Sequence, residues 1–124
     1  MEIELTSDGG YARIDAIAPT IYRDENGICA IMQDGPKTYA IYDEKNPGGV
    51  NTILAFQNGP AHESVNGISN EAVIAVLRHR IGMLNTIVPS EFNITAITHL
   101  GLALEALEQR TAQRKLIGIE GTML

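Results

Sequence analysis

The sequence predicts an α+β fold, in which an N-terminal antiparallel sheet of four to five strands is followed by a two-helix hairpin. Two observations predict it. Over residues 1–60, apolar residues alternate or form short blocks between turn signals. From residue 61 onward they step by three and four, which is the spacing of amphipathic helices. We expect a single domain, 1–124, made of the sheet (1–60) and the helical hairpin with a C-terminal turn (61–124).

The predicted strands follow one another as a meander. The first is "YARIDAIA", with Ala12, Ile14, Ala16 and Ala18 on one parity. The segments "ICAIMQ" and "TYAIYDE" come next, and the Asp34-Gly35 pair between them is a hairpin signal. The sequence "KNPGG" then breaks the chain before "VNTILAFQ". We therefore expect antiparallel neighbours throughout.

Two helices are predicted in the second half. The first begins at a cap provided by Ser69 or Asn70, and its apolar stripe contains Ala72, Val73, Ile74, Val76, Leu77, Ile81 and Leu84. Ser90, directly after Pro89, is the candidate cap of a second helix from about Glu91 to about Lys115. Its apolar positions are Ile97, Leu100, Leu104 and Leu107. Gly118 is well placed as the C-terminal stop.

Charge and composition limit the classes of function. The net charge of −6 argues against binding to a nucleic-acid polymer. Residues 1–77 carry eleven acids and four bases, whereas residues 78–124 carry four acids and five bases, so a site for an anion is expected in the second half. The single cysteine excludes an intrachain disulfide. With no signal-peptide pattern and no membrane span expected, we predict a soluble, cytoplasmic protein.

No catalytic constellation is expected. The sequence has no P-loop and no G-x-G-x-x-G motif after a strand. His62, His79 and His99 lack the spacing of metal ligands, and Cys29 lies in an apolar strand where a buried structural thiol is expected. Glu105 and Glu108 fit a solvated helix face. We therefore predict a protein that is not an enzyme, with no metal and no cofactor.

An arginine pair is the remaining candidate for binding chemistry. Arg110 and Arg114 are four residues apart on the second predicted helix, so both point the same way. They continue the flank of its apolar face, where guanidinium groups suit bidentate recognition of phosphate. Basic residues also favour helix C-termini because they complement the macrodipole. The spacing alone leaves both explanations open.

Four segments, in the same order and spacing, resemble the phage Thoeris anti-defence 1 family. They are "FQNGP" (56–60), "NGISNE" (66–71), Asn93 before a long helix, and "RTAQRKLIGIEGT" (110–122). The resemblance covers roughly residues 52–122. It implies a non-catalytic "sponge" that sequesters glycocyclic ADP-ribose made by host TIR-domain enzymes, in the cytoplasm of the infected bacterium. It also implies pockets between protomers of a homo-oligomer, either a dimer or a hexamer built from dimers, and no nucleic-acid polymer or membrane as a partner.

The resemblance also implies which residues contact the ligand. Asn93, Arg110 and Arg114 match family contacts. The family uses an aromatic stacking platform near the end of the first helix, and the matching position here is Leu84 or Met83, so the sequence departs from the family at this point. Phe92 is a candidate replacement. Thr111, Glu120 and Gly121 complete the predicted ligand-binding set, although Thr111 and Glu120 suit structural roles equally well, and Arg80 is a further candidate.

Helix geometry adds an expectation of its own. Asn93 and Arg110 are seventeen residues apart, which is about 25 Å along one helix. A cyclic nucleotide is much smaller, so both can touch one ligand only if they come from different chains. Small residues along the second helix (Ala96, Gly101, Ala103 and Ala106) permit close approach. An antiparallel C2 dimer would then have two equivalent pockets.

Three alternatives remain open on the sequence. The first is a sponge whose main or additional ligand is a cyclic di- or trinucleotide of CBASS-type defence. The second, weaker alternative is a hydrolase that degrades such signals. The third is an oligomeric interaction protein whose arginines only cap a helix. The identity of the isomer, the size of the oligomer and the role of Glu120 are not determined by the sequence.

Overall fold

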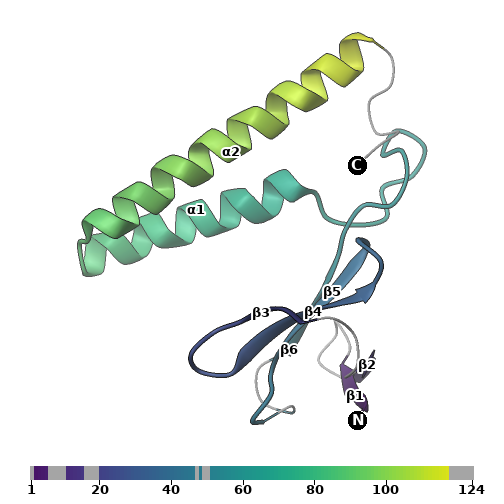
Figure 1. Cartoon of the computed structure of the whole chain (residues 1–124). Helices are drawn as coiled ribbons and strands as arrows, with labels where there is room; N and C mark the ends of the chain where they lie inside the picture. Colours follow the sequence, from purple (N-terminus) through teal and green to yellow (C-terminus); the bar gives the residue numbers. More distant parts are fainter. Residues whose placement is uncertain (1, 6–10, 16–19, 47, 49–50, 118–124) are drawn as a thin grey trace. The chain divides into compact units, whose positions relative to one another are not determined.

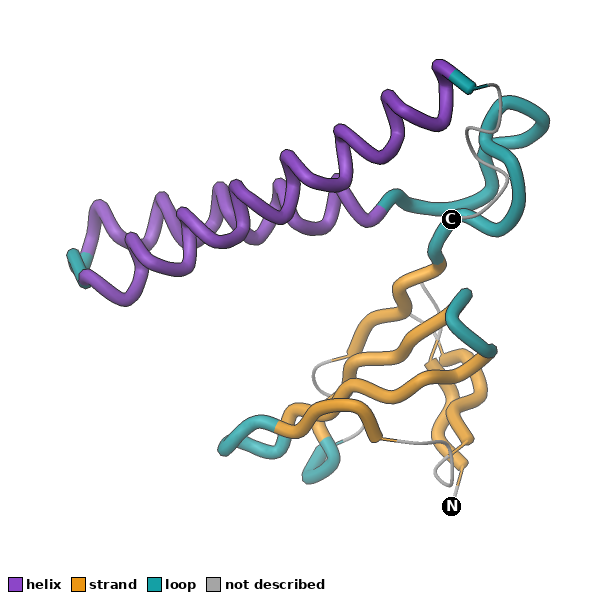
Figure 2. Tube along the Cα trace, turned by 45° about the horizontal axis from the view of Figure 1, so that its top comes forward, coloured by secondary structure: helices purple, strands orange, loops and turns teal. Residues whose placement is uncertain are grey.

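The computed structural model describes residues 2–5, 11–15, 20–46, 48 and 51–117, and it confirms the predicted α+β fold. Antiparallel strands occupy the N-terminal half, and two helices follow (Figures 1 and 2). The chain divides into two compact units, Met1–Phe56 and Gln57–Leu124, so the strands and the helices fall into separate units.

The first unit contains a two-stranded and a four-stranded antiparallel sheet. Strand β1 (Glu2–Leu5) pairs with β2 (Tyr11–Asp15). The four-stranded sheet follows the chain order β3 (Thr20–Arg23), β4 (Ile28–Asp34), β5 (Thr38–Asp43) and β6 (Asn51–Ala55). It is the predicted meander, with one difference. Its first strand is Thr20–Arg23, and Tyr11–Asp15 instead pairs with Glu2–Leu5. Ala16 and Ala18 lie outside the described residues.

The core of the four-stranded sheet is formed by the two central strands. Asp34 and Gly35 begin the β4–β5 turn, as predicted, with Lys37 N donating to Asp34 O at 3.0 Å and a positive φ of 52° at Gly35. The resulting register places Cys29 opposite Tyr42 and Ile31 opposite Ala40. Directly opposed residues share a face. These four residues are the buried core, and Ile53 of β6 packs against them.

The second unit is an antiparallel helical hairpin preceded by the loop 57–69. Helix α1 spans Asn70–Ile87, and Ser69 Oγ caps it by accepting from Ala72 N at 3.1 Å. Helix α2 spans Glu91–Leu116, capped by Ser90, whose Oγ accepts from Phe92 N at 3.2 Å. Of the two cap candidates for the first helix, Ser69 is the cap. The predicted start of the second helix is confirmed, while Gly118 lies outside the described residues.

The hairpin buries little of its apolar surface. Neither helix has a fully buried residue. The half-buried side of α2 is a stripe with alternating steps of three and four, formed by Asn93, Ile97, Leu100, Leu104, Leu107, Thr111 and Arg114, which is the spacing of a two-helix seam. Large apolar side chains remain exposed on the other faces: Val76, Leu77, Met83, Leu84, Ile87, Phe92, Ile94 and Leu102. Neither described helix has an apolar stretch sufficient to cross a membrane.

Candidate functional site

Arg110 lies on the half-buried side of α2, immediately beside the seam. Its Nε atom is removed from solvent and has no hydrogen-bond partner among the described residues. A buried donor left without a partner costs about 1–3 kcal/mol, and more when the group is charged. In proteins such donors are usually satisfied by another group, an ion or water. Arg110 is therefore a side chain whose buried donor still lacks an acceptor among the described residues.

The helix macrodipole does not account for this arginine. Arg114 and Lys115 lie in the last turn of α2, where a positive charge is stabilised by the C-terminal carbonyls. Arg110 lies more than a turn before the end at Leu116, where that stabilisation has fallen off. Arg114 and Thr111 are half-buried on the same side of the helix, whereas Lys115 is exposed. The structure thus groups Arg110, Thr111 and Arg114 at one end of the hairpin.

Asn93 lies at the opposite end of the hairpin, where it supports the turn between the helices. Its Nδ2 donates to Asn85 Oδ1 at 3.3 Å, and the same oxygen accepts from Ser90 N at 2.9 Å. Asn85 thereby ties the end of α1 to the cap and first turn of α2. The Asn93 Oδ1 makes no hydrogen bond with any described residue, so it stays available as an acceptor.

Met83 and Leu84 lie near the end of α1, at the same end of the hairpin as Asn93. They are 56% and 43% exposed. Both line an open groove along the outer side of α1, whose lining residues are Ala75, Val76, His79, Arg80, Met83, Leu84, Thr86 and Ile87. Phe92, at the start of α2, is 79% exposed. Met83 and Leu84 thus form an exposed apolar surface, and Arg80 is the charged arginine that lines the same groove.

The structure separates the two halves of the predicted site within one chain. Helix α2 is continuous from Glu91 to Leu116 (Figure 1), so Asn93 and Arg110 are about 25 Å apart along it. Met83, Leu84 and Asn93 lie toward the turn end, and the arginines lie toward the other end. Glu120 and Gly121 lie outside the described residues.

Two interhelical contacts were not predicted from the sequence. One is the Asn85 contact with Ser90 and Asn93. The other is Arg78, whose Nε donates to Ile97 O at 3.3 Å. A Cβ at position 101 would lie only 3.0–3.1 Å from the Arg78 guanidinium, so Gly101 permits this approach. A glycine in the middle of a helix is the available signal for such a contact.

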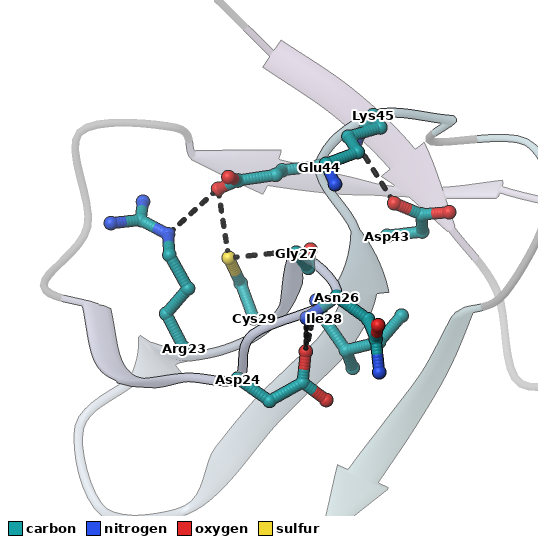
Figure 3. Close-up of polar contacts among 9 residues, drawn as sticks. All are labelled: Arg23, Asp24, Asn26, Gly27, Ile28, Cys29, Asp43, Glu44 and Lys45. Carbon is teal, nitrogen blue, oxygen red and sulfur yellow. Dashed lines mark hydrogen bonds and ion pairs between the residues drawn. The ribbon is translucent and has the colours of Figure 1, made fainter.

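A second polar cluster lies in the sheet unit, around Glu44 (Figure 3). Glu44 Oε2 accepts from Arg23 Nε at 2.9 Å and from the Cys29 thiol at 3.0 Å. Cys29 is 0% exposed. Burial, followed by the hydrogen bond to Glu44, raises the pKa of the Cys29 thiol. The thiol therefore stays protonated and acts as a hydrogen-bond donor. This arrangement is structural, in agreement with the prediction for Cys29.

The same cluster makes stability depend on pH. The hydrogen bonds from Cys29 and then Arg23 lower the pKa of Glu44 below its ordinary value of 4.5. A lowered folded-state pKa stabilises the fold above 4.5, and that contribution is lost as pH falls through the lowered value. We expect Glu44→Gln to lower the urea midpoint of the sheet unit at neutral pH, with the gap to the wild type shrinking as pH falls below 4.5.

The control for this prediction is Glu25→Gln in the adjacent β3–β4 turn. The Glu25 carboxylate makes no hydrogen bond with a described residue, so the change should leave the midpoint unaffected at every pH. A Glu44→Gln gap that stayed constant down to strongly acid pH would show that the ionisation of Glu44 is not coupled to folding.

The described residues were also compared with the ligand groups that metal ions require. Over those residues, no group of three or more His, Cys, Asp or Glu side chains is placed to hold a metal ion. The predicted site residues Asn93, Arg110 and Arg114 carry one amide and two guanidinium groups, which bind anions and hydroxyl groups.

Fold and site together define a small α+β protein whose helical hairpin carries a half-buried arginine pair. No family model matches the chain. It is similar to Thoeris anti-defense 1 of Bacillus phage SBSphiJ7, with 40% identity over 83 residues, which is 63% of this chain and 56% of that protein. The match confirms the resemblance to Thoeris anti-defence 1 proteins. The chain spans little more than half the length of this relative.

Proposed function

We propose that this protein counters the Thoeris anti-phage defence by sequestering its signal, glycocyclic ADP-ribose, in the cytoplasm of the infected host without chemical conversion. The similarity to a protein named Thoeris anti-defense 1 supports the anti-Thoeris role. The observation that carries the binding mechanism is the buried Nε of Arg110, which has no hydrogen-bond partner among the described residues. An anionic oxygen from a ligand would satisfy this donor.

The site residues that the structure describes are each assigned a role in the proposed complex. Arg110 and Arg114 hold the pyrophosphate through charge-assisted hydrogen bonds. Asn93 uses its Oδ1, which makes no hydrogen bond with a described residue, to accept from a ribose hydroxyl or a base edge. Met83 and Leu84 provide an apolar surface for the base in place of an aromatic ring. Thr111 is half-buried on the same side of α2 as Arg114, and we assign it a packing role.

The proposed pockets lie between protomers. A ligand much shorter than 25 Å cannot reach both Asn93 and Arg110 of one chain, since both lie on the single helix α2. The two helices have no fully buried residue and expose nine large apolar side chains, the ninth being Leu116. Burial of this surface would contribute about 25 cal/mol per Å². We infer that a second copy covers this surface and places the start of its α2 beside the end of the first. A C2 arrangement gives two equivalent pockets.

A related sponge for a cyclic di- or trinucleotide is the second candidate. The observation that favours testing it is the aliphatic surface of Met83 and Leu84, because stacking of a single base is weaker there than on an aromatic ring. Both candidates need the arginine pair. They differ in the ligand retained.

Recovery of the ligand after binding tests sequestration against degradation. The protein is mixed with glycocyclic ADP-ribose, or separately with cyclic di- and trinucleotides, and native mass spectrometry gives the stoichiometry of each complex. Each complex is then denatured and the released small molecule identified. We expect intact glycocyclic ADP-ribose, with two ligands per dimer. A cleaved product would establish a hydrolase, and retention of only the cyclic oligonucleotides would establish the second candidate.

A further inference from the structure

The loop between β6 and α1 contains two Asn-Gly pairs, Asn58-Gly59 and Asn66-Gly67. In such a pair the backbone nitrogen of the glycine can attack the side-chain amide of the asparagine, because no Cβ on the glycine obstructs the approach. Both asparagines are followed by the same residue, so the sequence does not distinguish them. The structure does.

The side chain of Asn66 is fixed at both ends of its amide. Its Oδ1 accepts from Asn58 N at 2.8 Å, and its Nδ2 donates to Asn58 O at 2.7 Å. Its own backbone N donates to Gln57 Oε1 at 3.0 Å. Turning the Asn66 amide toward the Gly67 nitrogen would break both side-chain bonds. Asn66 therefore clamps the loop and is held away from the reactive geometry.

Asn58 takes part in this clamp only through its backbone. Asn58 is exposed, and its side chain makes no hydrogen bond with any described residue. The Gly59 N–H likewise makes none within the described part of the chain, and Gly59 has a positive φ of 85°. At Asn58, no hydrogen bond with a described residue holds either the side-chain amide or the attacking Gly59 nitrogen. At Asn66, two hydrogen bonds hold the side-chain amide.

We propose that Asn58 is a site of spontaneous deamidation and that Asn66 is protected from it. The Gly59 nitrogen bonds to Cγ of Asn58 and gives up its proton. The Cγ–Nδ2 bond breaks, and the amide group leaves as ammonia. Water then opens the resulting succinimide at either carbonyl, which produces aspartate or isoaspartate at position 58.

The two products have different effects on the loop. Aspartate keeps the backbone of residue 58 and so keeps both acceptor and donor for Asn66. In isoaspartate the main chain continues through Cβ and Cγ of residue 58. The backbone carbonyl that accepted from Asn66 Nδ2 is then part of a free carboxylate and no longer belongs to the main chain. The added methylene also shifts Gly59, whose carbonyl accepts from Gln57 Nε2 at 3.2 Å. Isoaspartate at position 58 is therefore expected to open the loop 57–68.

Peptide mapping of the aged full-length protein tests the assignment. The protein is incubated in mildly alkaline buffer at physiological temperature, and the deamidated fraction at each asparagine is followed by mass spectrometry. We expect Asn58 to react at least about tenfold faster than Asn66, since two hydrogen bonds hold the latter. In denaturant the two rates should converge. Equal rates in the folded protein, or no reaction at Asn58 while the denatured control reacts, would overturn the proposal.

Two variants separate the clamp from the reactive site. Asn58→Ala removes the reactive amide but keeps the backbone groups that Asn66 binds, so loop amide hydrogen exchange should stay slow. Asn66→Ala removes the clamp, so exchange should rise while Asn58 remains reactive. Fast exchange in Asn58→Ala, or unchanged exchange in Asn66→Ala, would show that the amide contacts do not hold the loop.

Discussion

Reversing both arginines, as Arg110→Glu with Arg114→Glu, is expected to abolish binding of glycocyclic ADP-ribose. Each charge-assisted hydrogen bond to the pyrophosphate contributes about 1.5–3 kcal/mol, so losing both weakens binding by roughly two to four orders of magnitude. The introduced carboxylates also repel the ligand, which increases the loss. Isothermal titration calorimetry measures the dissociation constant, and circular dichroism establishes that the helices still form.

The chain offers a matched control in the neighbouring residue. Lys115→Glu reverses a charge in the same helical turn as Arg114, but on the exposed side. If binding depends on the half-buried side of α2, Lys115→Glu changes affinity little while Arg114→Glu alone weakens it strongly. Equal losses from these two single variants would mean that only the overall charge of this helix end matters. Normal binding by the double variant would eliminate the pocket.

Two binding-defective chains are expected to restore one site when they assemble together. Asn93→Ala lacks one half of each proposed pocket, and Arg110→Glu lacks the other. In a C2 heterodimer one pocket combines both defects, while the second takes its Asn93 and its Arg110 from the unaltered positions. Heterodimers purified through two different tags should therefore bind one ligand, the wild-type dimer two, and each variant homodimer none.

The structural role of Asn93 requires its own control, since it also contacts Asn85 at the turn. Asn85→Ala removes the acceptor shared by Ser90 and Asn93 but leaves the proposed ligand groups in place. Binding by Asn85→Ala together with loss in Asn93→Ala assigns the loss to ligand contact. A heterodimer that bound no ligand would show that Asn93 and Arg110 do not act across protomers.

Local patterns in the sequence were sufficient to predict the helices and most of the sheet. Ser69, one of the two candidate caps of the first helix, and Ser90 stand directly before stretches with helical spacing, and each caps its helix. The Asp34-Gly35 turn was equally predictable because its chemistry is local. The strands Glu2–Leu5 and Thr20–Arg23 were not predicted, because four-residue strands carry too little alternation to stand out from their surroundings.

The site was predictable only in part, since its contacts join residues distant in sequence. Spacing placed Arg110 and Arg114 on one side of a helix, and the structure adds that Arg110 Nε is buried and makes no hydrogen bond within the part of the chain that is described. The contact of Asn85 with Asn93 and the approach of Arg78 to Gly101 depend on how α1 lies against α2. That arrangement follows from side-chain packing across the seam, which the sequence of either helix alone does not specify.

The enclosed thiol of Cys29 has a practical consequence for studying the protein. It is the only cysteine in the chain, it is 0% exposed, and its raised pKa keeps it in the unreactive protonated form. The wild-type sequence is therefore already a silent background for thiol-directed fluorophores and spin labels. A single labelled cysteine introduced at an exposed position, for example by Lys115→Cys, can report on the arrangement of the protomers. The native Cys29 need not be removed.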